Sequence, residues 1–256
     1  MATALIEDPR ITRYRQRLAA ILRRSSCQWM AFAIGAAPVH RGFFDDVVAA
    51  IEGLPAGSAP KQSSSHRQVQ YGVRLRILAG DRARARYDAE GDVLYVPAET
   101  AFDGLDSQAG LIAACVHLGL DIQARNHNAF DSECTARIAG HLYRLFETIA
   151  DGDGEPEATE KLQTLAPVSA ADKAFFDVAA DILRHRRATL RANLRVSHPL
   201  QPGSFMKFVR TAQRARLHDI LVQEVGRDER RPQRTTGGLP RASRFLALQP
   251  LALSAA

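Results

Sequence analysis

The sequence predicts an α+β protein, in which a small antiparallel sheet or hairpin packs on helices and helical extensions flank it at both ends. Two observations predict this class. Hydrophobic residues alternate with polar ones over residues 69–77, which is the period of a half-buried strand. On both sides of this stretch they recur every three or four residues, which is the period of an amphipathic helix.

The amino-terminal region, residues 1–40, is expected to be helical. Apolar side chains recur at helical spacing over residues 11–25, among five arginines. A second helix is predicted over residues 43–51 and ends at Gly53, after which the chain is rich in Gly, Pro and Ser. Two helices are therefore expected ahead of the first strand, the first in residues 1–40 and the second at the start of the next region.

A core is predicted over residues 41–150. After the strand at 69–77, residues 82–97 predict two strands around a tight turn at Asp88–Gly91, and Pro97 ends the second of them. Two helices are expected next, and their start signals are side chains that can accept a hydrogen bond from a free backbone N–H. Ser107 is predicted to cap the first helix, which runs to Ala124. Asn128 or Asp131 is predicted to cap the second helix, which runs to Ile149.

The carboxyl-terminal part divides into three segments. Residues 151–168 are predicted to be an acidic linker, because Asp, Glu and Gly dominate the beginning of the segment. Residues 169–225 are predicted to be a basic helical region, with helices over 169–193 and 205–225. Residues 226–256 are rich in Arg, Pro and Gly and are expected to be a disordered tail.

The net charge of +6 is unevenly distributed along the 256 residues. Residues 182–256 hold 15 Lys and Arg against 4 Asp and Glu, so the remaining chain is acidic. A basic segment of this kind is typical of binding to nucleic acid, to acidic lipid or to an acidic partner, although a solvated helix face followed by a tail also accounts for it. The candidate binding residues are Arg184, Arg186, Arg187, Arg191, Arg210, Arg214 and Arg216.

The number of cysteines and the hydropathy of the chain indicate the cellular compartment in which the protein is expected. The three cysteines are few and widely spaced, which argues against a disulfide framework and fits a reducing environment. No apolar run approaches the ~20 residues of a membrane span, and no Sec-type signal peptide is recognisable. The abundance of Ala and Arg suggests a bacterial gene, so we expect the bacterial cytoplasm or secretion without a Sec signal.

Three segments of the predicted core carry a resemblance to a known family. They read YDAEGDVLYVP, LIAACVHLGLDIQ and DSECTARIAGHLYRLFE, in that order. Together they resemble the core of zincin-type metallopeptidases, especially the small effector-type zinc peptidases of bacteria. In that family a strand hairpin precedes a helix bearing HExxH, and a second helix supplies a third metal ligand, often Glu. The resemblance covers roughly residues 43–150.

The resemblance assigns roles to four positions. His117 matches the first metal ligand of HExxH, whereas Leu118 replaces the general-base Glu and Asp121 replaces the second His, so the motif reads HLGLD. Glu133 matches the third ligand by its placement in the next helix. Residues four apart lie on one helix face, and His, Asp and Glu all bind zinc, so a site of His117, Asp121 and Glu133 is chemically reasonable.

Catalysis at such a site is disfavoured. Zinc-dependent hydrolysis needs a base beside the metal-bound water, and Leu118 cannot accept a proton. An anionic Asp in place of a neutral His also reduces the positive charge that acidifies the water. The resemblance therefore implies a non-catalytic, pseudo-metallopeptidase-like protein that binds a protein partner, in a bacterial secretion or effector context. We name no catalytic residue and expect no cofactor.

Two other functions stay open. The first is a metal-dependent hydrolase with zinc at an unusual site of His117, Asp121 and Glu133. The second is a nucleic-acid or membrane-surface binder that uses the basic residues of 182–244. His117 is also consistent with an ordinary hydrogen-bonded histidine, and Glu133 with a favourable charge near a helix amino terminus.

Overall fold

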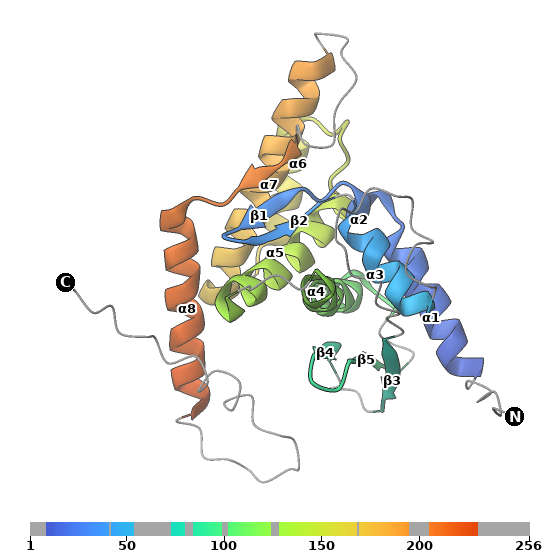
Figure 1. Cartoon of the computed structure of the whole chain (residues 1–256). Helices are drawn as coiled ribbons and strands as arrows, with labels where there is room; N and C mark the ends of the chain where they lie inside the picture. The colour runs from blue at the N-terminus through green and yellow to red at the C-terminus, as the bar shows by residue number, and fades with distance from the viewer. Residues whose placement is uncertain are drawn as a thin grey trace, which may run out of the picture.

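The computed structural model describes residues 9–40, 42–53, 73–79, 84–98, 102–123, 128–167, 169–194 and 205–229. Within these ranges the chain forms eight helices and two three-stranded sheets, which confirms the α+β class. Figure 1 shows helix α4 end-on in the middle, with one small sheet on either side of it. Each helix in this part of the chain is too short or too polar to cross a lipid bilayer.

The amino-terminal region contains strands as well as helices. The expected helix is present as α1 (Pro9–Leu22), and a short α2 (Ser25–Gln28) follows it. The chain then forms an antiparallel hairpin of β1 (Phe32–Ile34) and β2 (Ala37–Val39), which corrects the prediction of a purely helical region. All three β1 residues are buried, so the hairpin has no alternating pattern by which it could be recognised.

The next helix and strand lie near their predicted positions. Helix α3 (Phe43–Glu52) ends at Gly53, whose φ of 66° is the left-handed conformation that glycine adopts without strain. Strand β3 (Arg74–Leu78) covers the second half of the predicted strand. Residues 69–72, in its first half, lie outside the described residues.

The predicted hairpin is confirmed, but its sheet is mixed. Strands β4 (Arg86–Asp88) and β5 (Val93–Pro97) pair antiparallel, as expected. Strand β3 pairs parallel with β5, so the order is β3–β5–β4 and the prediction of an antiparallel sheet is corrected. The central place of β5 explains why four of its five residues are buried.

Helices α4 (Leu105–Ile122) and α5 (Ala129–Thr148) are the predicted pair. The side chain of Asn128 caps α5, as expected. Helix α4 begins two residues before the predicted cap Ser107, and Gly104 occupies its capping position. Ser107 therefore lies in the first turn of the helix instead of ahead of it.

The two helices pack antiparallel. A Cβ on Gly140 of α5 would lie 3.1 Å from the carbonyl oxygen of Ala109 near the start of α4. At the other end of the pair, Glu133 near the start of α5 lies beside His117 of α4. This packing brings the candidate site residues of both helices to one end of the interface.

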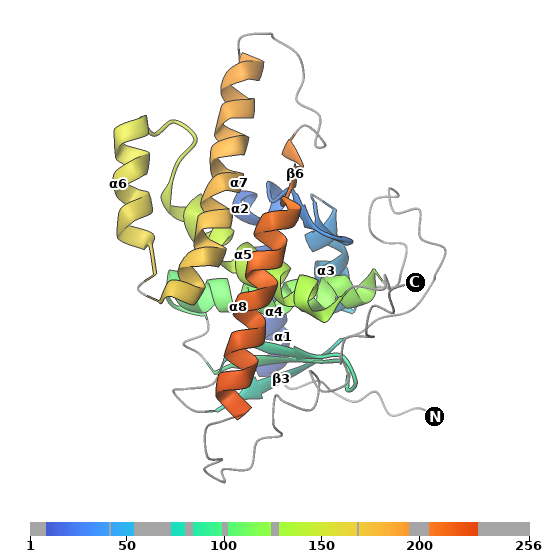
Figure 2. The same cartoon turned by 90° about the vertical axis from the view of Figure 1, so that its left-hand side faces the viewer.

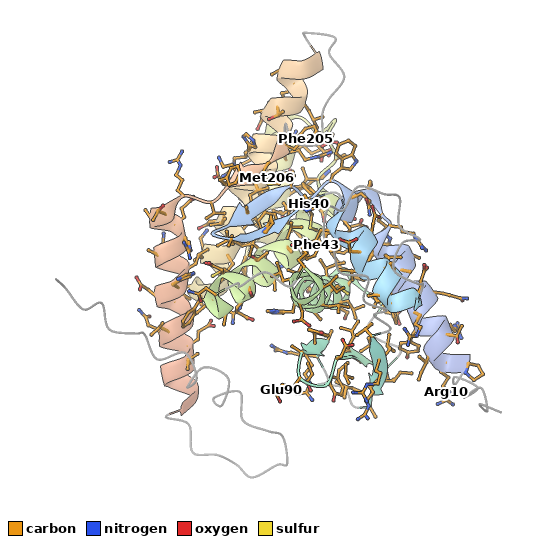
Figure 3. All side chains as sticks on the ribbon, viewed as in Figure 1. Arg10, His40, Phe43, Glu90, Phe205 and Met206 are labelled. Atoms are coloured by element: carbon orange, nitrogen blue, oxygen red, sulfur yellow. The ribbon has the colours of Figure 1, made fainter. Side chains whose placement is uncertain are left out.

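Helix α3 approaches α4 closely at Gly119. A Cβ at this position would overlap the ring of Phe43 and come within 2.8 Å of Val47. Figure 3 labels Phe43, whose side chain is 1% exposed. The small residue that the HLGLD motif carries at its centre therefore serves the packing of the core.

The carboxyl-terminal half is more ordered than predicted. Helix α6 (Glu155–Leu165) occupies most of the expected linker, and a proline in its first turn suits a helix start. Helix α7 (Ala170–Leu194) is confirmed. The predicted helix over 205–225 begins only at α8 (Thr211–Glu229), because strand β6 (Lys207–Phe208) first pairs with β1. The expected tail from 226 begins inside α8, and its residues from 230 lie outside the described part.

One hydrophobic core joins all these regions. Helix α7 contributes Phe175 and Leu183 to it, and α8 contributes Leu217 and Leu221. Figure 2 shows α8 lying across α5, with α7 beside it. The two long carboxyl-terminal helices are therefore packed parts of the same body that holds α4.

Candidate functional site

The predicted contact between His117 and Glu133 is present. The Nε2 atom of His117 lies 3.2 Å from Oε2 of Glu133, and both side chains are about one third exposed. The antiparallel packing of α4 and α5 brings them together. The expectation that His117 faces Glu133 from an adjacent helix is confirmed.

Glu133 also belongs to a longer chain of charges. Its Oε1 accepts a hydrogen bond of 2.8 Å from Nε of Arg137, and NH2 of Arg137 lies 2.8 Å from Glu224 of α8. Burial by itself raises the pKa of Glu133, but the hydrogen bond from His117 and the charge of Arg137 outweigh burial and lower it to about 2. Glu133 is therefore ionised at neutral pH and joins α5 to α4, while Arg137 joins α5 to α8.

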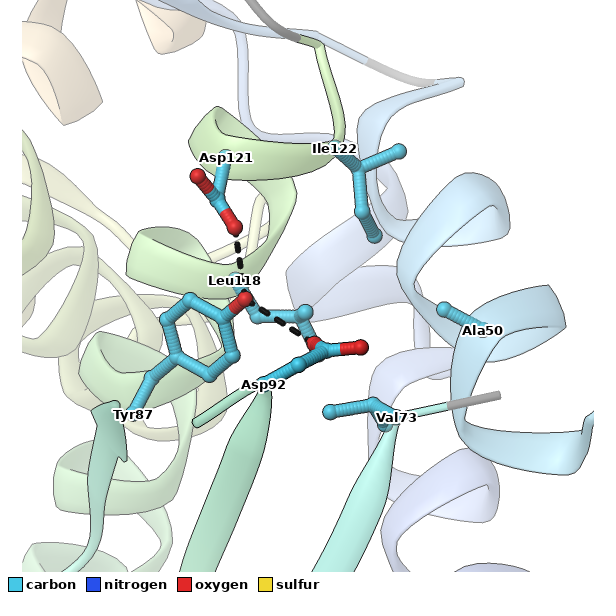
Figure 4. A pocket seen from close by; sticks show the side chains of 7 residues that line it. All are labelled: Ala50, Val73, Tyr87, Asp92, Leu118, Asp121 and Ile122. Carbon is cyan, nitrogen blue, oxygen red and sulfur yellow. Dashed lines mark hydrogen bonds between the residues drawn. The ribbon is translucent and has the colours of Figure 1, made fainter. Parts of the chain in front are cut away.

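Asp121 points to a different partner. Its Oδ2 accepts a hydrogen bond of 2.6 Å from the hydroxyl of Tyr87 on β4. The same hydroxyl lies 3.1 Å from Oδ1 of Asp92, as Figure 4 shows. Burial of Tyr87, its hydrogen bond to Asp121 and the charges of the two carboxylates raise the pKa of the tyrosine. Asp121 forms no i,i+4 pair with His117 in this arrangement.

These side chains border a cavity of about 220 Å³ between α3, α4 and the β3–β5–β4 sheet. Its lining is Ala50, Val73, Tyr87, Asp92, Leu118, Asp121 and Ile122. Leu118, at the position of the general base in the resembled family, is 1% exposed and forms part of an apolar wall. The lining therefore combines the polar side chains of Tyr87, Asp92 and Asp121 with an apolar wall, and position 118 offers no group that can accept a proton.

The three metal-ligand candidates do not form one group. His117 and Glu133 contact each other, whereas Asp121 is bonded to Tyr87. Among the described residues, no set of three or more His, Cys, Asp and Glu is placed to hold a metal ion. The donor set that the structure brings together consists of two ligands, which is fewer than the three that catalytic zinc sites take from protein.

A thiol nucleophile is not available near His117. All three cysteines are free and buried. Burial raises the pKa of Cys115 to about 12 and that of Cys134 to about 12, and it raises the pKa of Cys27 as well. The thiolate, which is the reactive form, is therefore suppressed at all three positions.

The predicted basic surface is only partly a surface. Arg186 and Arg187 are buried, at 8% and 5% exposed, which corrects their assignment as surface residues. Four of the seven arginines are held within the chain, as Arg186 to Asp151, Arg187 to the carbonyl of Asp153, Arg191 to Glu155 and Arg214 to Asp131. Arg184, Arg210 and Arg216 are exposed.

A second buried cluster joins α8 to α5. Asp131, whose side chain is 3% exposed, accepts two hydrogen bonds of 2.7 Å from Arg214. His218 Nε2 lies 2.9 Å from the same carboxylate. The sequence predicted Asp131 as a possible helix cap and not as a partner of α8. The i,i+4 spacing of Arg214 and His218 on a basic helix was the available signal for this cluster.

A comparison of the chain with protein-family models, with curated proteins and with solved structures finds no match. The zincin resemblance therefore stays a prediction that depends on the order of elements and on the His117–Glu133 contact.

Proposed function

We propose that this chain is a non-catalytic, pseudo-metallopeptidase-like protein that acts by binding a protein partner. The observation that carries the proposal is the contact of His117 with Glu133 beside a buried Leu118. The bacterial secretion or effector context has support only from the resemblance of the sequence.

Each side chain that hydrolysis would need has another role in the fold. Glu133 pairs with His117 of α4 and with Arg137, and Arg137 in turn pairs with Glu224 of α8. Asp121 accepts a hydrogen bond from the hydroxyl of Tyr87. Position 118 carries an alkyl side chain in place of a base. These contacts support a structural use of the site residues.

Zinc titration of the full chain by calorimetry tests this proposal. We expect no tight zinc binding by the wild type, because only two candidate ligands meet. The double substitution Leu118→Glu with Asp121→His restores HExxH and is expected to gain zinc binding. Leu118 is buried, so a charged residue there can prevent folding. Asp121→His alone is therefore the second variant, because Asp121 is exposed and its replacement leaves the core unchanged.

If the chain is instead a metal-dependent hydrolase, the wild type should bind zinc tightly. The support for this alternative is the proximity of His117 and Glu133, which are both zinc-ligand types. Tight zinc binding by the wild type that disappears in His117→Ala would favour this alternative and contradict the proposal. If neither the wild type nor the two variants bind zinc, His117 and Glu133 form an ordinary ion pair, and the descent from a metallopeptidase loses its support.

A further inference from the structure

A groove of about 450 Å³ runs between α6 and α7, away from the candidate site. Figure 2 shows α6 standing beside α7. Of the residues of α6, only Ala158 is fully buried, while Leu162 and Leu165 are partly buried against the hydrophobic core. The apolar lining consists of Ala158 and Leu162 from α6, of Ala166 directly after it, and of Phe176, Ala180, Leu183 and Ala188 from α7.

The charges around the groove are unbalanced. Four basic and two acidic residues line it, namely Lys173, Arg184, Arg187, Arg191, Glu155 and Asp177. Both acidic side chains already have a basic partner in the groove: Glu155 lies 2.5 Å from Arg191, and Asp177 lies 3.0 Å from Lys173. Arg184 and Arg187 are therefore the two basic lining residues that pair with neither of these acids, and Arg187 lies against Asp153 outside the lining.

These two arginines differ in exposure. Arg184 is exposed on the rim. Arg187 is 5% exposed; one of its terminal nitrogens donates to the carbonyl of Asp153, and its buried Nε has no acceptor among the described residues. The positive field also reaches Glu155, since the hydrogen bond from Arg191 and the charges of Arg191, Arg187 and Arg184 lower the pKa of that carboxyl. The groove thus favours anionic groups.

We propose that the α6–α7 groove binds an amphipathic helix of a partner protein whose polar face is acidic. This inference rests on the proposed protein-binding function and names its surface. The accessible apolar groups of the groove are Leu162, Ala166 and Ala188, and a groove between two helices can accept apolar side chains of a third helix at i, i+3, i+4 and i+7. Carboxylates beside them would then meet Arg184 and compete with Glu155 for Arg191.

The lining favours a protein partner over a nucleic acid. Nucleic-acid grooves combine positive charge with aromatic side chains on which bases stack. Here Phe176 is the one aromatic residue of the lining, and it is 3% exposed with its ring against His141. A buried aromatic ring contributes to the apolar base of the groove, but neither face of the ring is accessible to a nucleic-acid base.

The test measures binding of three labelled peptides to the full chain by fluorescence anisotropy. Each peptide is a helix of about 14 residues with leucines at i, i+3, i+4 and i+7, and its polar face carries Glu, Lys or Gln. We expect the Glu peptide to bind about tenfold more tightly than the Gln peptide, and the Lys peptide to bind more weakly than both. Equal affinity for the three peptides, or tighter binding of the Lys peptide, would overturn the proposal.

Two matched pairs of variants locate the binding. Arg184→Glu is expected to weaken the Glu peptide about fivefold or more, whereas Arg216→Glu makes the same charge change on exposed α8 and leaves binding unchanged. Leu162→Ala is expected to weaken all three peptides, whereas Val222→Ala, at a residue 55% exposed on α8, does not. Equal effects within either pair would place the binding elsewhere and overturn the proposal.

Two further measurements distinguish a protein partner from other ligands and binding from cleavage: displacement of the Glu peptide by competitors, and mass spectrometry of the peptide after binding. Displacement of the Glu peptide by a single-stranded oligonucleotide or by anionic vesicles, lost in Arg184→Glu, would assign the groove to that class and overturn the protein-partner proposal. If mass spectrometry shows that the bound peptide is intact, the result agrees with the proposal of a non-catalytic protein-binding groove. Zinc-dependent cleavage of the peptide would contradict the proposed non-catalytic function while leaving the groove assignment in place. A peptide that neither binds nor is cleaved contradicts the groove assignment alone.

Discussion

Glu133 shows how one side chain of the candidate site combines several roles. It accepts from Arg137 and contacts His117, while Arg137 continues to Glu224 on α8. The His117–Glu133 contact followed from the sequence, because helical periodicity and a short connection place both residues on facing helices. The continuation to Glu224 did not, because it joins residues that are distant in the sequence. Tyr87, the partner of Asp121, was missed for the same reason.

The first prediction concerns Glu133→Gln. The substitution removes a charge that pairs with two side chains, so we expect the free energy of unfolding to fall by about 1–3 kcal/mol near neutral pH. The folded state holds the pKa of Glu133 at about 2, below its ordinary value of 4.5, so its contribution is present above pH 4.5 and is lost as the pH falls towards 2.

Urea unfolding at about pH 7 and at about pH 3 checks this prediction. The difference between wild type and Glu133→Gln is expected to shrink at the lower pH. Glu157→Gln is the control, because Glu157 forms an exposed i,i+4 pair with Lys161. An undiminished difference at about pH 3 would show that the charge of Glu133 does not stabilise the fold.

At the scale of the elements, the packing of α4 decides where the candidate residues lie. Helix α3 fits against it because Gly119 has no side chain. Helix α5 fits against it at Gly140, and α8 is then fixed to α5 by Asp131 and by Arg137. Periodicity predicted the two long central helices well, whereas the three-residue strands β1 and β2 carry no period that a sequence could reveal.

The second prediction uses two glycines of one helix. Gly119→Ala places a Cβ into the ring of Phe43 and is expected to destabilise the protein by about 1–3 kcal/mol. Gly110→Ala meets no atom within 4 Å and is expected to stabilise it by about 0.5–1 kcal/mol, because alanine favours a helix. Thermal unfolding of both variants gives the comparison, and two changes of the same sign would refute this account of the α3–α4 contact.

The third prediction concerns the attachment of α8. Asp131→Asn removes a charge that is almost fully buried between Arg214 and His218, so a loss of about 3–5 kcal/mol is expected in urea unfolding. Asp219→Asn is the control at an exposed position of α8. Hydrogen exchange provides a local measure: amides of α8 should lose more protection than those of α4. Unchanged stability of Asp131→Asn would mean that α8 is held by its apolar contacts alone.

At the scale of the whole molecule, the α+β class and the order of the main elements could be predicted from the sequence. The mixed order β3–β5–β4 could not, because pairing between strands depends on contacts across the fold. The basic carboxyl-terminal region was expected to be an extension, but α7 and α8 supply Phe175 and Leu217 to the common core. Its arginines are partly neutralised by acidic residues of α5, α6 and the loop before α6.

The fourth prediction follows from the burial of every cysteine. The folded chain is expected to react with a thiol reagent such as Ellman's reagent about tenfold or more slowly than the chain in denaturant. The reason is that the thiols are buried and their pKa values are raised. Mass spectrometry identifies any residue that reacts. Rapid labelling of Cys134 in the folded protein would contradict this account of the buried thiols.

The central claim is that this chain does not hydrolyse peptide bonds. Its most direct test is the cleavage of an unfolded protein substrate by the purified full chain with added zinc, beside His117→Ala and beside the same samples with a chelator. The account predicts no difference among these samples, since position 118 is a buried leucine and only two candidate ligands meet. Cleavage by the wild type that requires zinc and is abolished in His117→Ala would contradict it.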